Sequence, residues 1–157
     1  MAKKTWSEKL ENGRTPEVKE VSAEAAAAMG GARMLIATPL CYDAIMKRVP
    51  QGKVITTDRI NAYLAKKHNA DWTCSLTAGI FVNIVAHASV ERRGENETPY
   101  WRTLKKGGEL NEKFPDGIDG HKLLLEREGH TVIQKGKRFF VDGFEKGLYE
   151  LKSRGSF

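Results

Sequence analysis

The chain has 157 residues, and its shares of hydrophobic (40%) and charged (29%) residues are those of a folded protein rather than a disordered one. No apolar run approaches the roughly 18 residues that a membrane-spanning helix requires, so we expect no membrane partner. No apolar stretch follows the lysines near the first residue, which argues against a secretory signal and for a cytoplasmic protein.

Cysteine and histidine are too sparse and too scattered to suggest bound metal. The two cysteines, Cys41 and Cys74, provide no disulfide framework, and free thiols suit a reducing compartment. The two cysteines and four histidines have none of the spacings of a zinc site. The sequence therefore predicts neither a metal site nor a cofactor.

Positive charge is concentrated in one short segment. Of the net charge of +6, +5 falls between Ala44 and Ala70, where six basic residues accompany a single acid, Asp58. Such a segment fits a surface that contacts phosphates, but it also fits an ordinary solvated helix face. Charge alone leaves both interpretations open.

Residues 1–32 predict a polar N-terminal extension. It contains one expected helix, over residues 23–28, which ends at Gly30-Gly31 because glycine tolerates positive φ. The apolar residues 34–37 that follow fit either a strand or a lead-in to the next helix.

Three helices are expected between residues 38 and 87. Thr38-Pro39 opens the first, because proline is tolerated in a first turn, and a turn at residues 50–52 ends it. Thr57 is the expected N-cap of the second helix. Residues 75–87 have the β-branched density of a buried strand, but their length and their Ala, Gly and Ser content favour a helix. Two helices joined by a short connector are typical of a helix-turn-helix.

The second half of the chain alternates glycine turns with short elements. Residues 101–111 predict a hairpin, residues 118–128 a helix that stops at Gly129, and residues 131–141 a second hairpin. A frayed tail is expected from Ser153. Helices followed by small β-hairpins indicate an α+β fold, a winged helix-turn-helix.

Four motifs follow one another in a characteristic order. They are Thr38-Pro39 with IMKRVPQGKV over residues 45–54, the start of the helix-turn-helix over residues 54–62, Thr98-Pro99-Tyr100-Trp101-Arg102, and LLEREG over residues 124–129. In this order they resemble the DNA-binding domain of the alkylguanine-DNA alkyltransferase (methylated-DNA-protein-cysteine methyltransferase) family. The resemblance implies a winged helix-turn-helix of that type over residues 33–129. A C-terminal hairpin and tail, residues 130–157, lie outside the resemblance and are expected to pack on this domain.

The chain departs from this family where the family does its chemistry. Alkyl transfer requires a cysteine thiolate activated by histidine and glutamate. The resemblance places Tyr100 at the cysteine position and Trp101 at the histidine position, and only Arg102 and Glu128 match. We therefore expect a non-catalytic protein, similar to the alkyltransferase-like proteins that keep the fold and lose the cysteine.

Two further family features are missing. The tyrosine that helps to rotate a nucleotide out of the duplex is Thr57 here, and residues 75–77 contain no arginine where the family's intercalating arginine should fall. The expected partner is double-stranded DNA, with alkylated or damaged DNA as the expected target and a DNA-repair protein as a further partner. A winged-helix transcription regulator or an architectural DNA-binding protein is the alternative, and an active alkyltransferase with a displaced cysteine is a third hypothesis.

The candidate residues form two groups. DNA contacts are expected from phosphate-binding cations, from short polar groups suited to the groove, and from positions that the resemblance supplies: Arg48, Lys53, Thr57, Arg59, Ser75, Thr77, Asn83, Arg102, Lys105 and Lys106. Asn83 equally fits a buried polar residue on a packed helix. The resemblance surrounds a former active-site pocket with Pro99, Tyr100, Trp101, Arg102 and Glu128, although the two rings could also fill that space.

Overall fold

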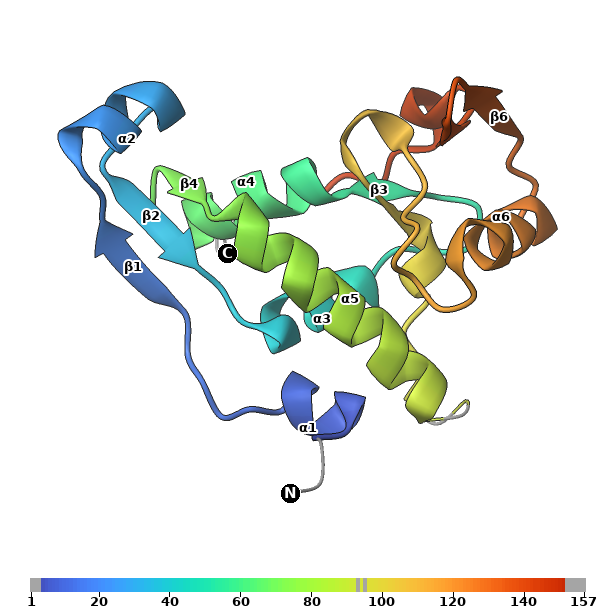
Figure 1. Cartoon of the computed structure of the whole chain (residues 1–157), viewed down its shortest axis with the longest axis horizontal. Coiled ribbons are helices and arrows are strands. Elements are labelled where there is room, and N and C mark those ends of the chain that lie inside the picture. The colour runs from blue at the N-terminus through green and yellow to red at the C-terminus, as the bar shows by residue number, and fades with distance from the viewer. Residues whose placement is uncertain (1–3, 93, 95, 152–157) are drawn as a thin grey trace, which may run out of the picture.

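The computed structural model describes residues 4–92, 94 and 96–151, and it has the mixed α+β architecture that the sequence predicts. The tail expected from Ser153 lies outside the described residues. Within them, no helix is long and apolar enough to cross a membrane. Helix α5 (Ser75–Glu91) runs through the middle of the molecule, with α1 (Trp6–Leu10) beside it and the β6–β7 hairpin at the opposite end from β1 (Figure 1).

The N-terminal residues contain more structure than the single helix that the sequence predicts. Besides α2 (Ala23–Met29), which ends at Gly30 with φ 92°, they form α1 and strand β1 (Glu17–Glu20). A helix as short as α1 has little stability of its own and depends on packing, here against α5. Strand β1 pairs antiparallel with β2 (Arg33–Ile36), so the predicted boundary after residue 32 separates two paired strands.

The helix-turn-helix is formed by α4 (Thr57–Lys67) and α5, joined through β4 (Trp72–Thr73). Strand β4 pairs in parallel with β2 and completes a three-stranded sheet in the order β1-β2-β4. The preceding helix α3 (Pro39–Met46) is capped by the Thr38 side chain, as expected. The run at residues 75–87 is helical, as expected, and its buried residues recur at the spacing of a helix.

The prediction of Thr57 as an N-cap is wrong by one residue. Thr56, at the end of β3 (Ile55–Thr56), occupies the cap position, and Thr57 is the first helical residue of α4. The Thr57 hydroxyl instead donates to the Leu104 carbonyl at 3.1 Å. This bond is available because β3 pairs in parallel with β5 (Thr103–Leu104).

The first predicted hairpin, over residues 101–111, is also wrong. Residues Tyr100–Arg102 and Lys106–Gly108 form 3₁₀ turns, and only a single antiparallel bridge joins Lys105 to Glu109. A ladder cannot extend from that bridge, because β5 pairs with β3 and the Leu110 amide donates to Phe139.

The last predicted elements are confirmed. Helix α6 (Gly117–Arg127) is followed by Gly129 at φ 92°. Strands β6 (Val132–Lys135) and β7 (Arg138–Val141) form a hairpin, and a 3₁₀ turn, Phe144–Gly147, follows it.

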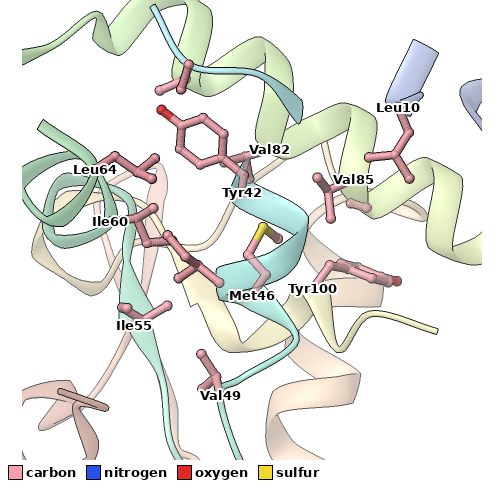
Figure 2. Close-up of a cluster of buried hydrophobic side chains, with 14 of the residues drawn as sticks. Leu10, Tyr42, Met46, Val49, Ile55, Ile60, Leu64, Val82, Val85 and Tyr100 are labelled. Atoms are coloured by element: carbon pink, nitrogen blue, oxygen red, sulfur yellow. The ribbon is translucent and has the colours of Figure 1, made fainter. Parts of the chain in front are cut away.

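The core lies between α3, α4 and α5. Tyr42 and Met46 of α3 are fully buried, with side chains of α4 and α5 packed around them (Figure 2). A second, smaller cluster joins the hairpin to the rest of the domain and comprises Val54, Leu104, Leu110, Leu125 and Val141.

Candidate nucleic-acid interface

A hollow of about 470 Å³ separates the helix-turn-helix from the loop that follows β5. Five of the predicted DNA-contacting residues line it, from three elements far apart in the sequence: Thr57, Ser75, Asn83, Lys105 and Lys106. Its volume is within the usual range of ligand sites. We call this cavity the hollow.

The polar wall of the hollow is held from behind by a buried histidine. The Asn111 side-chain amide donates to the Asn83 amide oxygen at 3.2 Å, and the Asn111 backbone N–H donates to Nδ1 of His121 at 3.1 Å. Nε2 of His121 lies 2.8 Å from the Trp101 carbonyl, and burial lowers the pKa of this histidine to about 4. A neutral imidazole that accepts at Nδ1 therefore donates from Nε2, which links α6 through Asn111 to α5.

The apolar wall of the hollow consists of exposed side chains of α5. Leu76 is 76% exposed and Ile80 is 52% exposed, one turn apart on the same face of the helix. Gly79 lies between them, and a Cβ built there meets no atom within 4 Å. Packing therefore does not require glycine at this position. Glycine inside a helix lowers stability by roughly 0.5–1 kcal/mol relative to alanine.

The charge around the hollow is mixed. Lys105, Lys106 and Lys113 line it together with Asp58 and Glu112, which leaves an excess of a single positive charge. Lys105 also forms ion pairs with Glu109 and Glu112. Of the two lysines that the sequence singles out here, Lys106 is the more exposed.

Several predicted DNA contacts lie elsewhere. The Thr77 hydroxyl donates to the Cys74 carbonyl in the first turn of α5. Lys53 is exposed in the turn after Pro50, while Arg48 and Arg59 line cavities on another side of α4. The structure thus divides the basic segment between different surfaces.

The positions of the former active-site motif are filled by side chains. Tyr100 is only 5% exposed, and its ring makes edge contacts with Trp101 and Phe114 at centroid distances of 5.4 and 5.3 Å. Burial raises the pKa of the Tyr100 hydroxyl to about 12, so it is protonated at neutral pH. Pro99 precedes the 3₁₀ turn that holds both rings.

Arg102 and Glu128 form an internal ion pair. Nε and Nη2 of Arg102 donate to both carboxylate oxygens of Glu128 at 2.7–3.1 Å, and Nη1 donates to the Val49 carbonyl at 2.8 Å. Burial alone would raise the pKa of Glu128, but the hydrogen bonds from Arg102 lower it below its ordinary value. The donors of Arg102 are directed into the protein, so we leave this residue out of the interface.

Neither cysteine lies in the motif. Cys41, in α3, accepts a hydrogen bond from the Thr38 hydroxyl, and Cys74 directly precedes α5. Both cysteines are half-buried. Within the described residues, no group of three or more His, Cys, Asp or Glu side chains could hold a metal ion.

Among the polar residues at the hollow that sequence reasoning missed are Asn61, Asn111 and Lys113 of its lining and His121 behind it. Asn61 could have been found, because it lies one turn after Thr57 on the same face of α4. Asn111 could not, because it was assigned to the end of a hairpin, and Lys113 and His121 could not, because only the fold brings them to the hollow.

The fold is similar to that of the S. pombe alkyltransferase-like protein ATL in its crystal structure in complex with DNA. That match has 20% sequence identity, covers 71% of this chain and 92% of the other, and has a TM-score of 0.51. The crystal structure of S. pombe Atl1 with damaged DNA containing O6-carboxymethylguanine has 21% identity, the same coverage and a TM-score of 0.49. No protein-family model matches the chain, and neither does any curated protein. The resemblance noted in the sequence is thus confirmed for the fold.

Proposed function

We propose that the protein binds duplex DNA without catalysis, in the manner of an alkyltransferase-like protein, through the surface around the hollow. The observation that carries this proposal is the convergence of the exposed face of α5, the N-terminus of α4 and the Lys105-Lys106 loop on one cavity. Cations at its rim suit phosphates, while the Asn83–Asn111 pair suits polar groups in a groove.

The residues at the motif support the absence of catalysis. A buried tyrosine with a raised pKa is a poor nucleophile at neutral pH, and Trp101 has no basic nitrogen with which to accept its proton. His121 is near, but its ring nitrogens are engaged by Asn111 and Trp101. These side chains support binding and structure, and none of them supplies a nucleophile.

Duplex binding is tested by fluorescence anisotropy over a series of salt concentrations, with unmodified and O6-alkylguanine duplexes. The double change Lys105→Ala with Lys106→Ala should weaken binding and reduce the log–log salt slope by about 0.9 for each phosphate that the variant no longer neutralises. Arg127→Ala with Lys146→Ala removes the same charge from exposed positions outside the hollow and is the matched control. An equal weakening in both double variants would contradict the proposal.

The same titration separates damaged from undamaged DNA as the target. The packing of Tyr100 against Trp101 and Phe114 favours the second candidate function, a regulator or architectural protein on undamaged DNA, because it fills the former pocket. Tighter binding of the alkylated duplex would support the alkyltransferase-like role, and equal binding would support the regulator.

Catalysis is tested separately by intact-protein mass spectrometry after incubation with the alkylated duplex. We expect an unchanged mass. A stoichiometric gain on Cys41 or Cys74 would establish alkyl transfer and refute the non-catalytic assignment.

A further inference from the structure

Most of the positive charge of the basic segment faces away from the hollow. At 3.6 residues per turn, Arg59, Tyr63 and Lys66 lie on the side of α4 nearly opposite to Thr57 and Asn61. There they line a cavity of about 420 Å³ together with Tyr149, Glu150 and Leu151. A second cavity, of about 100 Å³, adjoins it at Tyr63 and is lined by Arg48 and Lys67. We call these two cavities together the tyrosine groove.

The cations of the groove are not neutralised by the protein. Within the described residues, none of Arg48, Arg59, Lys66 and Lys67 forms an ion pair with an acidic side chain. Glu150 is the single acid among the lining residues, so the groove carries an excess of three positive charges. Unpaired like charges gathered on one surface repel one another and attract a polyanion.

Aromatic rings are interleaved with these cations. The Arg48 guanidinium lies 5.9 Å from the centre of the Tyr63 ring, and its buried Nε has no hydrogen-bond partner among the described residues. The nearby Tyr63 hydroxyl, and after it that of Tyr149, favours the charged guanidinium and raises the pKa of Arg48. Both tyrosines are only half-buried, so part of each ring remains accessible from the groove.

The chemistry of the groove distinguishes among acidic ligands. A duplex keeps its bases stacked inside a stiff cylinder, so it can reach the exposed Arg59, Lys66 and Lys67 but cannot place a ring beside Tyr63 or Tyr149. An acidic peptide offers carboxylates without regularly spaced aromatic groups. A single strand offers phosphates together with unstacked bases, and every base has a face that stacks on an aromatic ring.

We infer that the tyrosine groove is a binding site for single-stranded nucleic acid, separate from the hollow. The phosphates lie along Arg59, Lys66 and Lys67, and a base enters the larger cavity beside Tyr63 and Tyr149. The inference does not rest on duplex binding, because the hollow and the groove share no lining residue.

The probe is a short, fluorescently labelled oligothymidylate, titrated with the full chain and followed by anisotropy. Arg59→Glu with Lys66→Glu should weaken its binding by at least tenfold, and Arg127→Glu with Lys146→Glu, which changes the net charge equally, should weaken it far less. Tyr63→Leu keeps an apolar side chain but removes the ring, and should weaken binding by roughly tenfold if a base stacks there. Thermal unfolding of each variant verifies that it folds.

Each outcome decides for or against the groove. Loss of oligothymidylate binding in the Arg59/Lys66 variant, with duplex binding retained, supports it. Equal loss in both charge variants, loss in Lys105→Ala with Lys106→Ala instead, or equal displacement by polyglutamate would overturn it. If duplex binding alone fails, the proposed function is refuted, but the inference that the groove binds single strands is not.

Discussion

His121 is a fully buried histidine whose two ring nitrogens bond to backbone groups of two different loops. Burial lowers its pKa from 6.5 to about 4 in the folded protein, whereas the unfolded chain takes up the proton near the ordinary value. His121 thus imposes no loss of stability above pH 6.5, and it destabilises the folded state increasingly as the pH falls towards 4. The loss amounts to about 3 kcal/mol, since each pKa unit corresponds to about 1.4 kcal/mol.

Urea unfolding at several pH values tests this expectation. His121→Gln should flatten the dependence between pH 6.5 and about 5, apart from a contribution from His130, whose pKa burial also lowers. Below about pH 5, carboxylates with lowered pKa values, such as Glu128, contribute in both proteins. His68→Gln, at the end of α4, is the control and should retain the dependence. An equally steep dependence in His121→Gln would show that other groups carry it.

Tyr100 is expected to act as a core residue. Tyr100→Ala should lower the free energy of unfolding by about 3–5 kcal/mol, the range for large buried aromatic side chains. Tyr100→Phe keeps the ring and should preserve stability, because the hydroxyl has no hydrogen-bond partner within the described part of the chain. A stable Tyr100→Ala variant with weakened DNA binding would mean that the ring lines a pocket.

At the scale of elements, helix α1 tests whether the N-terminal residues belong to the same folding unit. Leu10 is 3% exposed and packs in the main core (Figure 2). The Glu91 carboxylate accepts from the Trp6 and Ser7 amides at 3.1 and 2.9 Å. Leu10→Ala should therefore destabilise the whole domain by about 2–5 kcal/mol. Leu123→Ala, at a 50% exposed position on α6, should change stability by less than about 0.5 kcal/mol. An unchanged unfolding midpoint in Leu10→Ala would indicate an independent extension.

The elements also show what could be predicted from the sequence. Helices α3, α4 and α6 and the last hairpin follow from caps, glycine stops and apolar periodicity, and α5 follows from its length and composition. All of these are local signals. Strand β1 and helix α1 could not be predicted, because their stability comes from β2 and α5, which are distant in the sequence. The hairpin predicted over residues 101–111 does not form for the same reason, because β5 pairs with β3, from an earlier part of the chain.

The candidate site was predicted in part. Five lining residues of the hollow were found by residue type and by resemblance, while Asn111 and His121 depend on a loop conformation that no local pattern specifies. The basic segment was found as a unit, but only the fold shows that four of its cations lie at the tyrosine groove and none at the hollow.

At the scale of the molecule, α4 separates two surfaces of different chemistry. The hollow combines exposed apolar side chains with an almost balanced charge. The tyrosine groove combines aromatic rings with cations that form no ion pair within the described part of the chain. Duplex binding at the hollow should therefore depend less on salt than single-strand binding at the groove. Comparison of the two log–log salt slopes checks this expectation, and a steeper slope for the duplex would contradict it.

The central claim, that duplex DNA binds around the hollow, is tested most directly by NMR. The measurement is the change in backbone amide chemical shifts when an unlabelled duplex is added to the isotope-labelled protein. The account predicts the largest changes in residues 75–83 of α5 and in the loop over residues 105–113, with small changes around Tyr63 and Tyr149. Changes confined to the tyrosine groove, or no changes at DNA concentrations that saturate the anisotropy signal, would contradict it.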